Sequence, residues 1–296
     1  MILLLKGNIV ALITPFDEVG NINYLKLSQL IAYQNFMGTD ALVVLGSTGE
    51  STSLTDKEKE EIVRFVVKEN ASRLKIVVGV IESDTKKALE KSKVYEKLGA
   101  DYLLVITPFY TKSNDNGIYE HFKLIASNIN IPMLVYNVPS RTGVNISVDV
   151  LKKLKDIPNI IGIKEATTDV NHIIEVSLMC DHYFHLYGGN DELSYLFLSL
   201  NASGLINVVG NYNPELFEIL LHTYEENPYL AYEYFKEIYP FLKSLCIEGN
   251  PIPIKVLMNY LGYDVGKFRL PLSSMNINNK EKLLDIYKKT FILSNK

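Results

Sequence analysis

The chain has 296 residues, enough for one large domain or two small ones. Its composition, with 47% hydrophobic and 22% charged residues, is ordinary for a soluble globular protein. The formal net charge is −4 and the basic residues are dispersed, which argues against nucleic acid as the main partner, because phosphate binding needs a concentrated basic surface. Only two cysteines occur, Cys180 and Cys246, so no disulfide framework is indicated and a reducing cytoplasm fits.

The apolar start MILLLKGNIVALITP does not fit a secretory signal peptide. No basic region precedes it, Lys6 and Asn8 interrupt it, and no small-residue cleavage site follows. No uninterrupted apolar run approaches the roughly 18 residues that a membrane helix needs. We therefore expect a cytoplasmic protein.

Eight short apolar runs recur along the chain, each followed by a polar turn. They are NIVALIT from Asn8, ALVVLG from Ala41, KIVVGV from Lys75, YLLVIT from Tyr102, PMLVYN from Pro132, IIGIKE from Ile160, FHLYGG from Phe184 and GLINVV from Gly204. They are rich in Val, Ile and Leu and show little polar alternation. This pattern is typical of strands covered on both faces, as in a parallel sheet.

Amphipathic stretches of helical length lie between these runs, as at Thr55–Asn70, Asp84–Leu98 and Val148–Leu154. The first of them begins with a threonine cap followed by acidic residues. Eight strands alternating with eight helices predict an α/β fold, a (β/α)8 or TIM barrel, over residues 1–226. A doubly wound sheet is the second interpretation, but no GxGxxG opens a helix after the first strand.

The pattern changes after Asn227. Pro228–Glu248 is helical in pattern and rich in aromatic residues, and NPIPIKVLMNYLG and the stretch Lys280–Leu293 follow. No Ser/Gly linker or low-complexity segment separates them from the barrel. We predict that residues 227–296 form a C-terminal helical region packed on the barrel.

Polar residues gather where the predicted strands end, which is where barrels of this kind build their active sites. The segments are GSTGES at 46–51, TPFY at 107–110, YNVPSRTG at 136–143, Lys164 with Glu165, and GGND at 188–191. The chemistry is therefore expected at one end of the barrel.

Lys164 ends a strand whose other residues favour a dry interior. A lysine at a strand end usually extends its ammonium group into solvent. Burial in a dry pocket, in contrast, lowers the pKa of a lysine amine from about 10.4 towards neutrality, and the neutral amine can form a Schiff base with a carbonyl. The position among the other polar strand ends favours the second interpretation.

Two loops supply candidate partners for this lysine. In GSTGES, Gly46 and Gly49 are expected to let the backbone turn sharply so that N–H groups face a small carboxylate, although such a loop alone is more often a plain connection. In YNVPSRTG, Tyr136 is placed to pass protons beside the lysine. Arg141 follows Pro139 and is suited to hold a carboxylate with its guanidinium fork.

The motifs GSTGES, VITPFY, YNVPSRTG, GIKEAT and EGNPIPIK, in this order and spacing, closely resemble the dihydrodipicolinate synthase family. That family belongs to the pyruvate-dependent class I aldolases, which include N-acetylneuraminate lyase. The resemblance runs from Gly7 to about Leu272. It implies condensation of pyruvate with aspartate-4-semialdehyde in lysine and diaminopimelate biosynthesis, through a covalent lysine–pyruvate Schiff base, with no other cofactor and no metal.

The resemblance also implies roles for individual residues. Lys164 matches the Schiff-base lysine and Tyr136 the proton-relaying tyrosine. Ser47, where the family usually has threonine, would link Tyr136 to Tyr110, the tyrosine that reaches into the neighbouring subunit. The matches for substrate binding are Thr48 for the pyruvate carboxylate, Arg141 for the carboxylate of the second substrate, and Gly189 and Ile206 as lining residues. A homotetramer built from tight dimers is implied as well.

Three departures leave other activities open. Ser47 with Thr48 is also the pair found in neuraminate lyases, and the third and eighth strand ends, GVIESDT and GLINVVGN, differ from the usual synthase sequences. An aldolase acting on a sugar acid or another aldehyde, or an inactive binding barrel, therefore remains an alternative. Arg141 favours the synthase, since sugar-acid lyases generally lack it.

The family's feedback site for lysine is altered. Its histidine, asparagine, glutamate and tyrosine positions hold Asp56, Ser83, Lys87 and Phe109 here. A lysine in place of glutamate repels an incoming ammonium group, so weak or absent inhibition by lysine is expected.

A zinc site is a further alternative, because Cys180, His182 and His185 form a C-x-H-x2-H run. The run falls between a predicted helix and strand, away from the active end, and lacks a fourth ligand. We therefore do not predict a metal.

Overall fold

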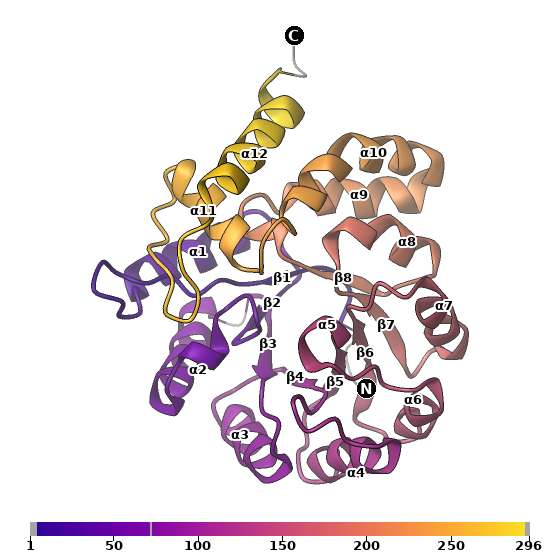
Figure 1. Cartoon of the computed structure of the whole chain (residues 1–296). Coiled ribbons are helices and arrows are strands. Elements are labelled where there is room, and N and C mark those ends of the chain that lie inside the picture. Colours follow the sequence, from indigo (N-terminus) through magenta and orange to yellow (C-terminus); the bar gives the residue numbers. More distant parts are fainter. Residues whose placement is uncertain (1–4, 72, 294–296) are drawn as a thin grey trace.

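The computed structural model describes residues 5–71 and 73–293, so the outermost residues of both predicted regions, 1–4 and 294–296, lie outside it. Its eight parallel strands form a closed barrel in sequence order, which confirms the predicted fold (Figure 1). The strands are β1 (Gly7–Ala11), β2 (Ala41–Val44), β3 (Lys75–Val80), β4 (Tyr102–Ile106), β5 (Met133–Asn137), β6 (Ile160–Glu165), β7 (His185–Gly188) and β8 (Gly204–Asn207).

A helix follows each strand and covers the outside of the barrel. These helices are α1 (Tyr24–Phe36), α2 (Asp56–Asn70), α3 (Thr85–Lys97), α4 (Asp115–Ala126), α6 (Val148–Lys155), α7 (Val170–Met179), α8 (Ser194–Ser199) and α9 (Glu215–Glu226). The short helix α5 (Pro139–Thr142) and the 3-10 turns η1 (Ser51–Ser53), η2 (Asp191–Leu193) and η3 (Val209–Asn211) lie in the loops that follow β5, β2, β7 and β8.

Local sequence explains where the best-predicted helix begins. Thr55 caps α2, its hydroxyl accepting from the N–H of Glu58 while the Glu58 carboxylate accepts from the N–H of Thr55. This reciprocal arrangement satisfies two backbone donors that the first helical turn would otherwise leave free. The predicted and observed boundaries of this helix agree to within one residue.

The apolar residues form two packed layers. One cluster fills the barrel itself with side chains such as Ile9, Val77 and Leu104, and a larger cluster lies between the strands and the helices. Alternate residues of each strand point into one layer or the other, because successive side chains of a strand face opposite sides. This alternation decides which polar residues at the strand ends face inward.

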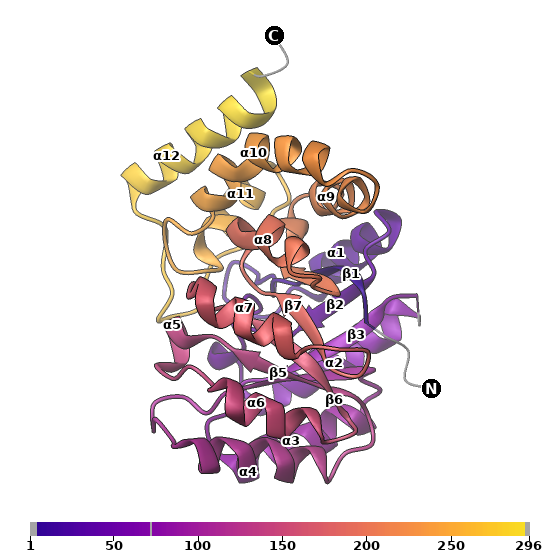
Figure 2. The ribbon, with the colours of Figure 1, turned by 90° about the vertical axis from the view of Figure 1, so that its right-hand side faces the viewer.

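The C-terminal region contains α10 (Pro228–Ser244), α11 (Ile252–Tyr260), α12 (Ile277–Lys288) and a π-helical end, η4 (Lys289–Leu293). These helices gather on one side of the barrel beyond α8 and α9 (Figures 1 and 2). The first ends four residues before the predicted Glu248, and residues 245–250 return across the end of the barrel instead. None of the helices in the described ranges is long and apolar enough to cross a membrane.

A fully buried ion pair ties this region to the barrel. Lys255 in α11 donates from Nζ to Glu50 Oε1 at 2.8 Å and to the carbonyls of Thr14 and Lys267 at 3.3 and 2.7 Å. The ammonium also lies 4.7 Å from the ring centroid of Phe16. Burial lowers the pKa of Lys255, and the Glu50 carboxylate opposes that shift. The pair fixes the loop after β2 from a residue more than 200 positions away.

We predict that Lys255→Met lowers the free energy of unfolding by about 3–5 kcal/mol, because it leaves the buried Glu50 carboxylate without its cationic partner and with only the backbone N–H of Arg269 as a donor. Urea denaturation followed by circular dichroism measures this loss. Lys236→Met is the matched control, since Lys236 lies 2.7 Å from Glu233 on the surface, and its denaturation midpoint should equal that of the wild type. A loss below about 1 kcal/mol in the Lys255 variant contradicts the prediction.

Candidate active site

A cavity of about 640 Å3 opens at the carboxyl end of the barrel. It brings together most of the site residues that the sequence predicts, namely Ser47, Thr48, Tyr136, Arg141, Lys164 and Gly189. The segment 245–250 forms another part of its wall, so the cavity draws on both predicted regions of the chain.

Lys164 projects into this cavity from β6. Its side chain is only 7% exposed, and among the described residues its Nζ has neither a carboxylate within ion-pair distance nor a hydrogen-bond acceptor. The nearest described contact is the ring of Tyr136, whose centroid lies 4.6 Å from Nζ. A buried lysine is normally paired, so an amine held only against an aromatic face is free to approach a carbonyl carbon.

Strand register places these two side chains next to each other. In the β5–β6 pair Tyr136 is opposite Lys164, and Asn137 is opposite Glu165. Tyr136 and Lys164 face the barrel interior, so the next pair faces outward towards the helices. Thr107 fixes the carbonyl of Tyr136 through its N–H at 3.0 Å and its hydroxyl at 2.9 Å.

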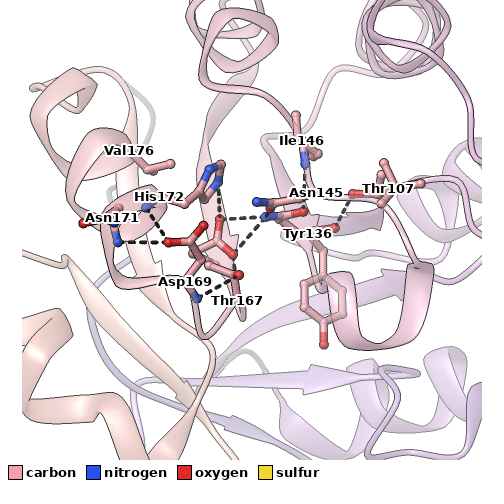
Figure 3. Close-up of polar contacts among 12 residues, drawn as sticks. Thr107, Tyr136, Asn145, Ile146, Thr167, Asp169, Asn171, His172 and Val176 are labelled. Atoms are coloured by element: carbon pink, nitrogen blue, oxygen red, sulfur yellow. Dashed lines mark hydrogen bonds and ion pairs between the residues drawn. The ribbon is translucent and has the colours of Figure 1, made fainter.

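The outward-facing pair is the centre of a buried polar network (Figure 3). Glu165 is fully buried and accepts from Asn137 Nδ2 at 2.9 Å and from the N–H of Thr167 at 2.8 Å. His172 Nε2 lies 3.4 Å from the same carboxylate. Figure 3 shows the ring of Tyr136 pointing away from this network.

The loop after β2 differs from its predicted geometry. The residues with left-handed backbone are Leu45 (φ 56°) and Glu50 (φ 53°), not Gly46 or Gly49. A Cβ on Gly79 of β3 would lie 2.5 Å from the Leu45 carbonyl oxygen, so that glycine makes room for the turn. Gly49 is needed for close packing, since its Cβ would lie 3.2 Å from the carbonyl oxygen of Leu12.

This loop still offers donors to the cavity. The N–H groups of Gly49 and Glu50 are used within the turn, but those of Ser47 and Thr48 donate to no backbone carbonyl of the described residues. The Thr48 hydroxyl accepts from Asn250 Nδ2 at 2.9 Å. Two adjacent free N–H groups with a neighbouring hydroxyl are suited to hold a carboxylate.

Asn250 is a site residue that the sequence reasoning did not single out, although it lies in the EGNPIPIK motif. Besides its bond to Thr48, its carbonyl accepts from Arg141 Nη2 at 2.9 Å. Arg141 is exposed at the mouth of the cavity, and this bond leaves its other N–H groups available. One residue from the C-terminal region thus orients both predicted carboxylate-binding residues.

Asp191 was also missed, although it belongs to the GGND segment. It is buried beside the cavity and accepts from the N–H groups of Val208 and Val209 at 3.1 and 2.7 Å. Burial raises the pKa of Asp191 to about 7, while these two amides and the positive charge of Lys164 act in the opposite direction. The carboxyl group therefore holds the loop after β8 and adds a titratable group next to the lysine.

Two predicted residues do not line the cavity. Ile206 is buried in the barrel interior with Ala166, beneath the site rather than at its wall. Tyr110 is 92% exposed, with left-handed backbone (φ 71°), and lies outside the cavity of its own chain. Ser47 lines both the main cavity and a smaller one of about 260 Å3 that contains Phe109.

The zinc alternative finds no support in the part of the chain that the structure describes, which contains no group of three His, Cys, Asp or Glu side chains placed to hold a metal ion. Cys180 donates from Sγ to the carbonyl of Val176, and His185 Nδ1 lies 3.1 Å from the hydroxyl of Ser203.

Comparison with known proteins decides the family. The sequence profile of the Dihydrodipicolinate synthetase family matches residues 4–290. The chain belongs to this family. It is 41% identical to the 4-hydroxy-tetrahydrodipicolinate synthase of Clostridium novyi (strain NT), covering 97% of this chain and 98% of that one. It is 40% identical to the enzyme of the same name from Caldicellulosiruptor bescii, covering 95% of each chain.

Solved structures of the family agree with this assignment. Dihydrodipicolinate synthase from Aquifex aeolicus superposes with a TM-score of 0.92 at 39% identity, over 96% of this chain and 97% of that one. The 4-hydroxy-tetrahydrodipicolinate synthase from Methylacidiphilum fumariolicum SolV gives 0.94 at 34% identity, over 97% and 96%. The resemblance that the motifs indicated is confirmed along nearly the whole chain.

We predict that Gly189→Ala slows Schiff-base formation by about 10- to 100-fold, because misplacing a reacting group by about 1 Å has a cost of that order. The added Cβ would lie 2.7 Å from the Glu165 carbonyl oxygen and 3.1 Å from Lys164 Cε. The rate of borohydride-trapped adduct formation with pyruvate, followed by intact mass, measures the effect. Gly249→Ala is the matched control, since its Cβ would meet nothing within 4 Å. Equal rates for the two variants contradict the prediction.

Proposed function

We propose that this enzyme is a 4-hydroxy-tetrahydrodipicolinate synthase that condenses pyruvate with L-aspartate-4-semialdehyde through a Schiff base on Lys164. The observation that carries the proposal is the buried amine of Lys164, which lies against Tyr136 and has no carboxylate within ion-pair distance among the described residues, in a cavity that Thr48 and Arg141 also line. The product serves lysine and diaminopimelate biosynthesis, and the full-length relatives support this assignment.

The reaction follows from the chemistry of an amine and a 2-keto acid. The neutral amine of Lys164 attacks the keto carbon of pyruvate, a hydroxyl is protonated and leaves as water, and a protonated imine forms. The imine accepts electrons as a methyl proton is lost, which gives a nucleophilic enamine. The enamine carbon attacks the aldehyde of the second substrate, and cyclisation and release regenerate the free lysine.

The ring of Tyr136 lies beside the reacting amine, with its centroid 4.6 Å from Lys164 Nζ, and we assign the tyrosine the proton transfers at the keto oxygen. Ser47 lines the same cavity and also the smaller one that contains Phe109, the residue before Tyr110. A hydroxyl in this place can pass a proton between two phenols, so serine preserves the role that threonine has in the family. The proposal requires no cofactor beyond the covalent adduct.

The two carboxylates have separate binding groups. The free N–H groups of the loop after β2, with the Thr48 hydroxyl, are assigned to pyruvate. Arg141, oriented by the carbonyl of Asn250, is assigned to the second substrate. Gly189 supplies room beside Lys164, and Ile206 closes the barrel below. An arginine at the mouth favours the amino-acid aldehyde over a sugar acid, which is the alternative substrate class.

Tyr110 supports an oligomeric enzyme. This residue has left-handed backbone and is almost fully exposed, and its phenol lies outside the cavity of its own chain. The phenol can take part in catalysis if it enters the site of a neighbouring subunit. We propose a homotetramer assembled from dimers, as the resemblance implies. The two free cysteines, Cys180 and Cys246, are consistent with a cytoplasmic location.

Borohydride reduction in the presence of pyruvate tests the first half of the proposal. We expect one pyruvate-sized adduct per chain on the peptide that contains Lys164, and none in Lys164→Met. Lys59→Met is a control, because Lys59 is another buried lysine but lies 3.4 Å from Glu82 as an ion pair. Absence of the adduct in the wild type would remove the mechanism and leave the inactive binding barrel.

Condensation with L-aspartate-4-semialdehyde tests the second half. Arg141→Ala should lower kcat/KM for this aldehyde by about 10- to 100-fold, since a charge-assisted bidentate contact is worth about 1.5–3 kcal/mol. Trapping of pyruvate should be unchanged in the same variant. A wild type that traps pyruvate but condenses only with sugar-derived aldehydes would favour the lyase alternative.

We predict that L-lysine inhibits the enzyme weakly or not at all. Asp56 is already paired with Lys91 at 2.8 Å, Lys59 lies 3.9 Å away, and these lysines and Lys87 lower the pKa of Asp56. The ammonium group of a bound lysine would therefore meet positive charge. Initial rates with added lysine hydrochloride, compared with sodium chloride at equal ionic strength, measure this. Half-inhibition at sub-millimolar lysine contradicts it.

A further inference from the structure

The buried network behind the active site contains one titratable contact, between His172 of α7 and Glu165 of β6. Both side chains are buried, and His172 Nε2 lies 3.4 Å from Glu165 Oε2. This distance is within ion-pair range but is longer than that of a well-aligned hydrogen bond, so the contact is an ion pair when the imidazole is protonated. Among the described residues, His172 Nε2 has no acceptor with hydrogen-bond geometry, so its interaction with a polar group is the contact with the Glu165 carboxylate.

Glu165 cannot remain a buried carboxylate without compensation, because removing one partner of a buried ion pair leaves an unbalanced charge. Its neutral donors are the Asn137 side chain and the N–H of Thr167. Among the described residues, the one group within ion-pair distance that can carry a positive charge is His172.

The backbone connects this network to three parts of the active site: Lys164, Tyr136 and the loop that carries Arg141. Glu165 directly follows Lys164, and Asn137 directly follows Tyr136. Asn137 also accepts from the N–H of Ile146 at 3.2 Å and donates to Asn145 Oδ1 at 2.6 Å. Both ends of the loop that carries Arg141 are thereby attached to the pair.

We propose that His172 is a positioning residue: as an imidazolium it pairs with Glu165, and the Glu165–Asn137 contact that it stabilises aligns Tyr136 with Lys164. The inference rests on the proposed function. His172 does not touch the cavity and takes no part in the chemistry, so it acts through the ends of β5 and β6 (Figure 3).

The charges around His172 give the direction of its pH dependence. Glu165 from β6, and Asp169 and Glu175 from its own helix, raise the pKa of His172 against the opposing effect of burial, with the Glu165 contact as the largest cause. A raised pKa means that the pair is complete below the ordinary histidine value of about 6.5 and is lost as pH rises through the higher value in the folded enzyme. The alignment of Tyr136 with Lys164 should therefore weaken at pH values above the pKa of His172.

Titration of the five histidines by NMR tests the contact itself. We expect His172, assigned by its absence from His172→Gln, to titrate above about 6.5, and its midpoint to fall in Glu165→Gln. His222 is an internal control, because it also lies 3.4 Å from a glutamate, Glu226, but on the surface, and its resonances should be the same in the wild type and in Glu165→Gln.

The pH profile of kcat tests the positioning role. The wild type should lose kcat as pH rises through the His172 midpoint. His172→Arg, which stays charged, should move this loss to higher pH, and His172→Gln should lower kcat by about tenfold throughout, a cost expected for slightly misplaced reacting groups. KM for pyruvate should change little, since the amides of Ser47 and Thr48 are not part of the network.

The outcomes separate this inference from the function on which it rests. A His172 midpoint that ignores Glu165→Gln, or a His172→Gln variant with the kcat and pH profile of the wild type, overturns the positioning role. Failure of the wild type to trap pyruvate overturns the proposed function instead. If His172→Gln does not fold, His172→Arg supplies both the assignment of the His172 signal and the kcat profile that test the positioning role.

Discussion

The site depends on the register of the β5–β6 pair. Tyr136 stands opposite Lys164 in this pairing, and Asn137 stands opposite Glu165. Because side chains alternate along a strand, one pair of neighbours faces the cavity while the next lies among the helices. A slip of β6 by one residue would bring Glu165 opposite Tyr136, placing a carboxylate in the cavity and turning Lys164 towards the helices. The buried contacts between Asn137 and Glu165 therefore secure both the fold and the placement of the amine.

A second constraint comes from the C-terminal region. Lys255 binds Glu50 of the loop after β2, and Asn250, five residues earlier, contacts Thr48 of the same loop and Arg141. One segment thus holds the loop at two points. The division between barrel and helical region describes how the chain is arranged, but the site requires both, since neither the loop nor the arginine is oriented by the barrel alone.

Sequence alone was sufficient wherever the determining interactions are local or repeat regularly. The eight apolar runs mark the strands, and the capping box at Thr55 and Glu58 marks the start of α2. Sequence was insufficient where a residue far away in the chain determines the local structure. The turn after β2 is left-handed at Leu45 because Gly79, on another strand, leaves space, and no property of GSTGES indicates this. The partnership of His172 with Glu165 likewise exists only once α7 packs against β6.

These constraints together explain how Lys164 has no ion-pair partner in the part of this acidic protein that the structure describes. The carboxylates at and around the cavity are engaged elsewhere: Glu165 with Asn137 and His172, Glu50 with Lys255, Asp191 with two backbone amides, Glu192 with the Cys246 thiol, and Glu248 with Asn276 and Asn279. A free carboxylate within reach of Lys164 would hold its ammonium form as an ion pair and remove the nucleophile. The polar groups around the end of the barrel thus contribute to reactivity mainly by forming hydrogen bonds and ion pairs with one another. This leaves the amine of Lys164 available for substrate.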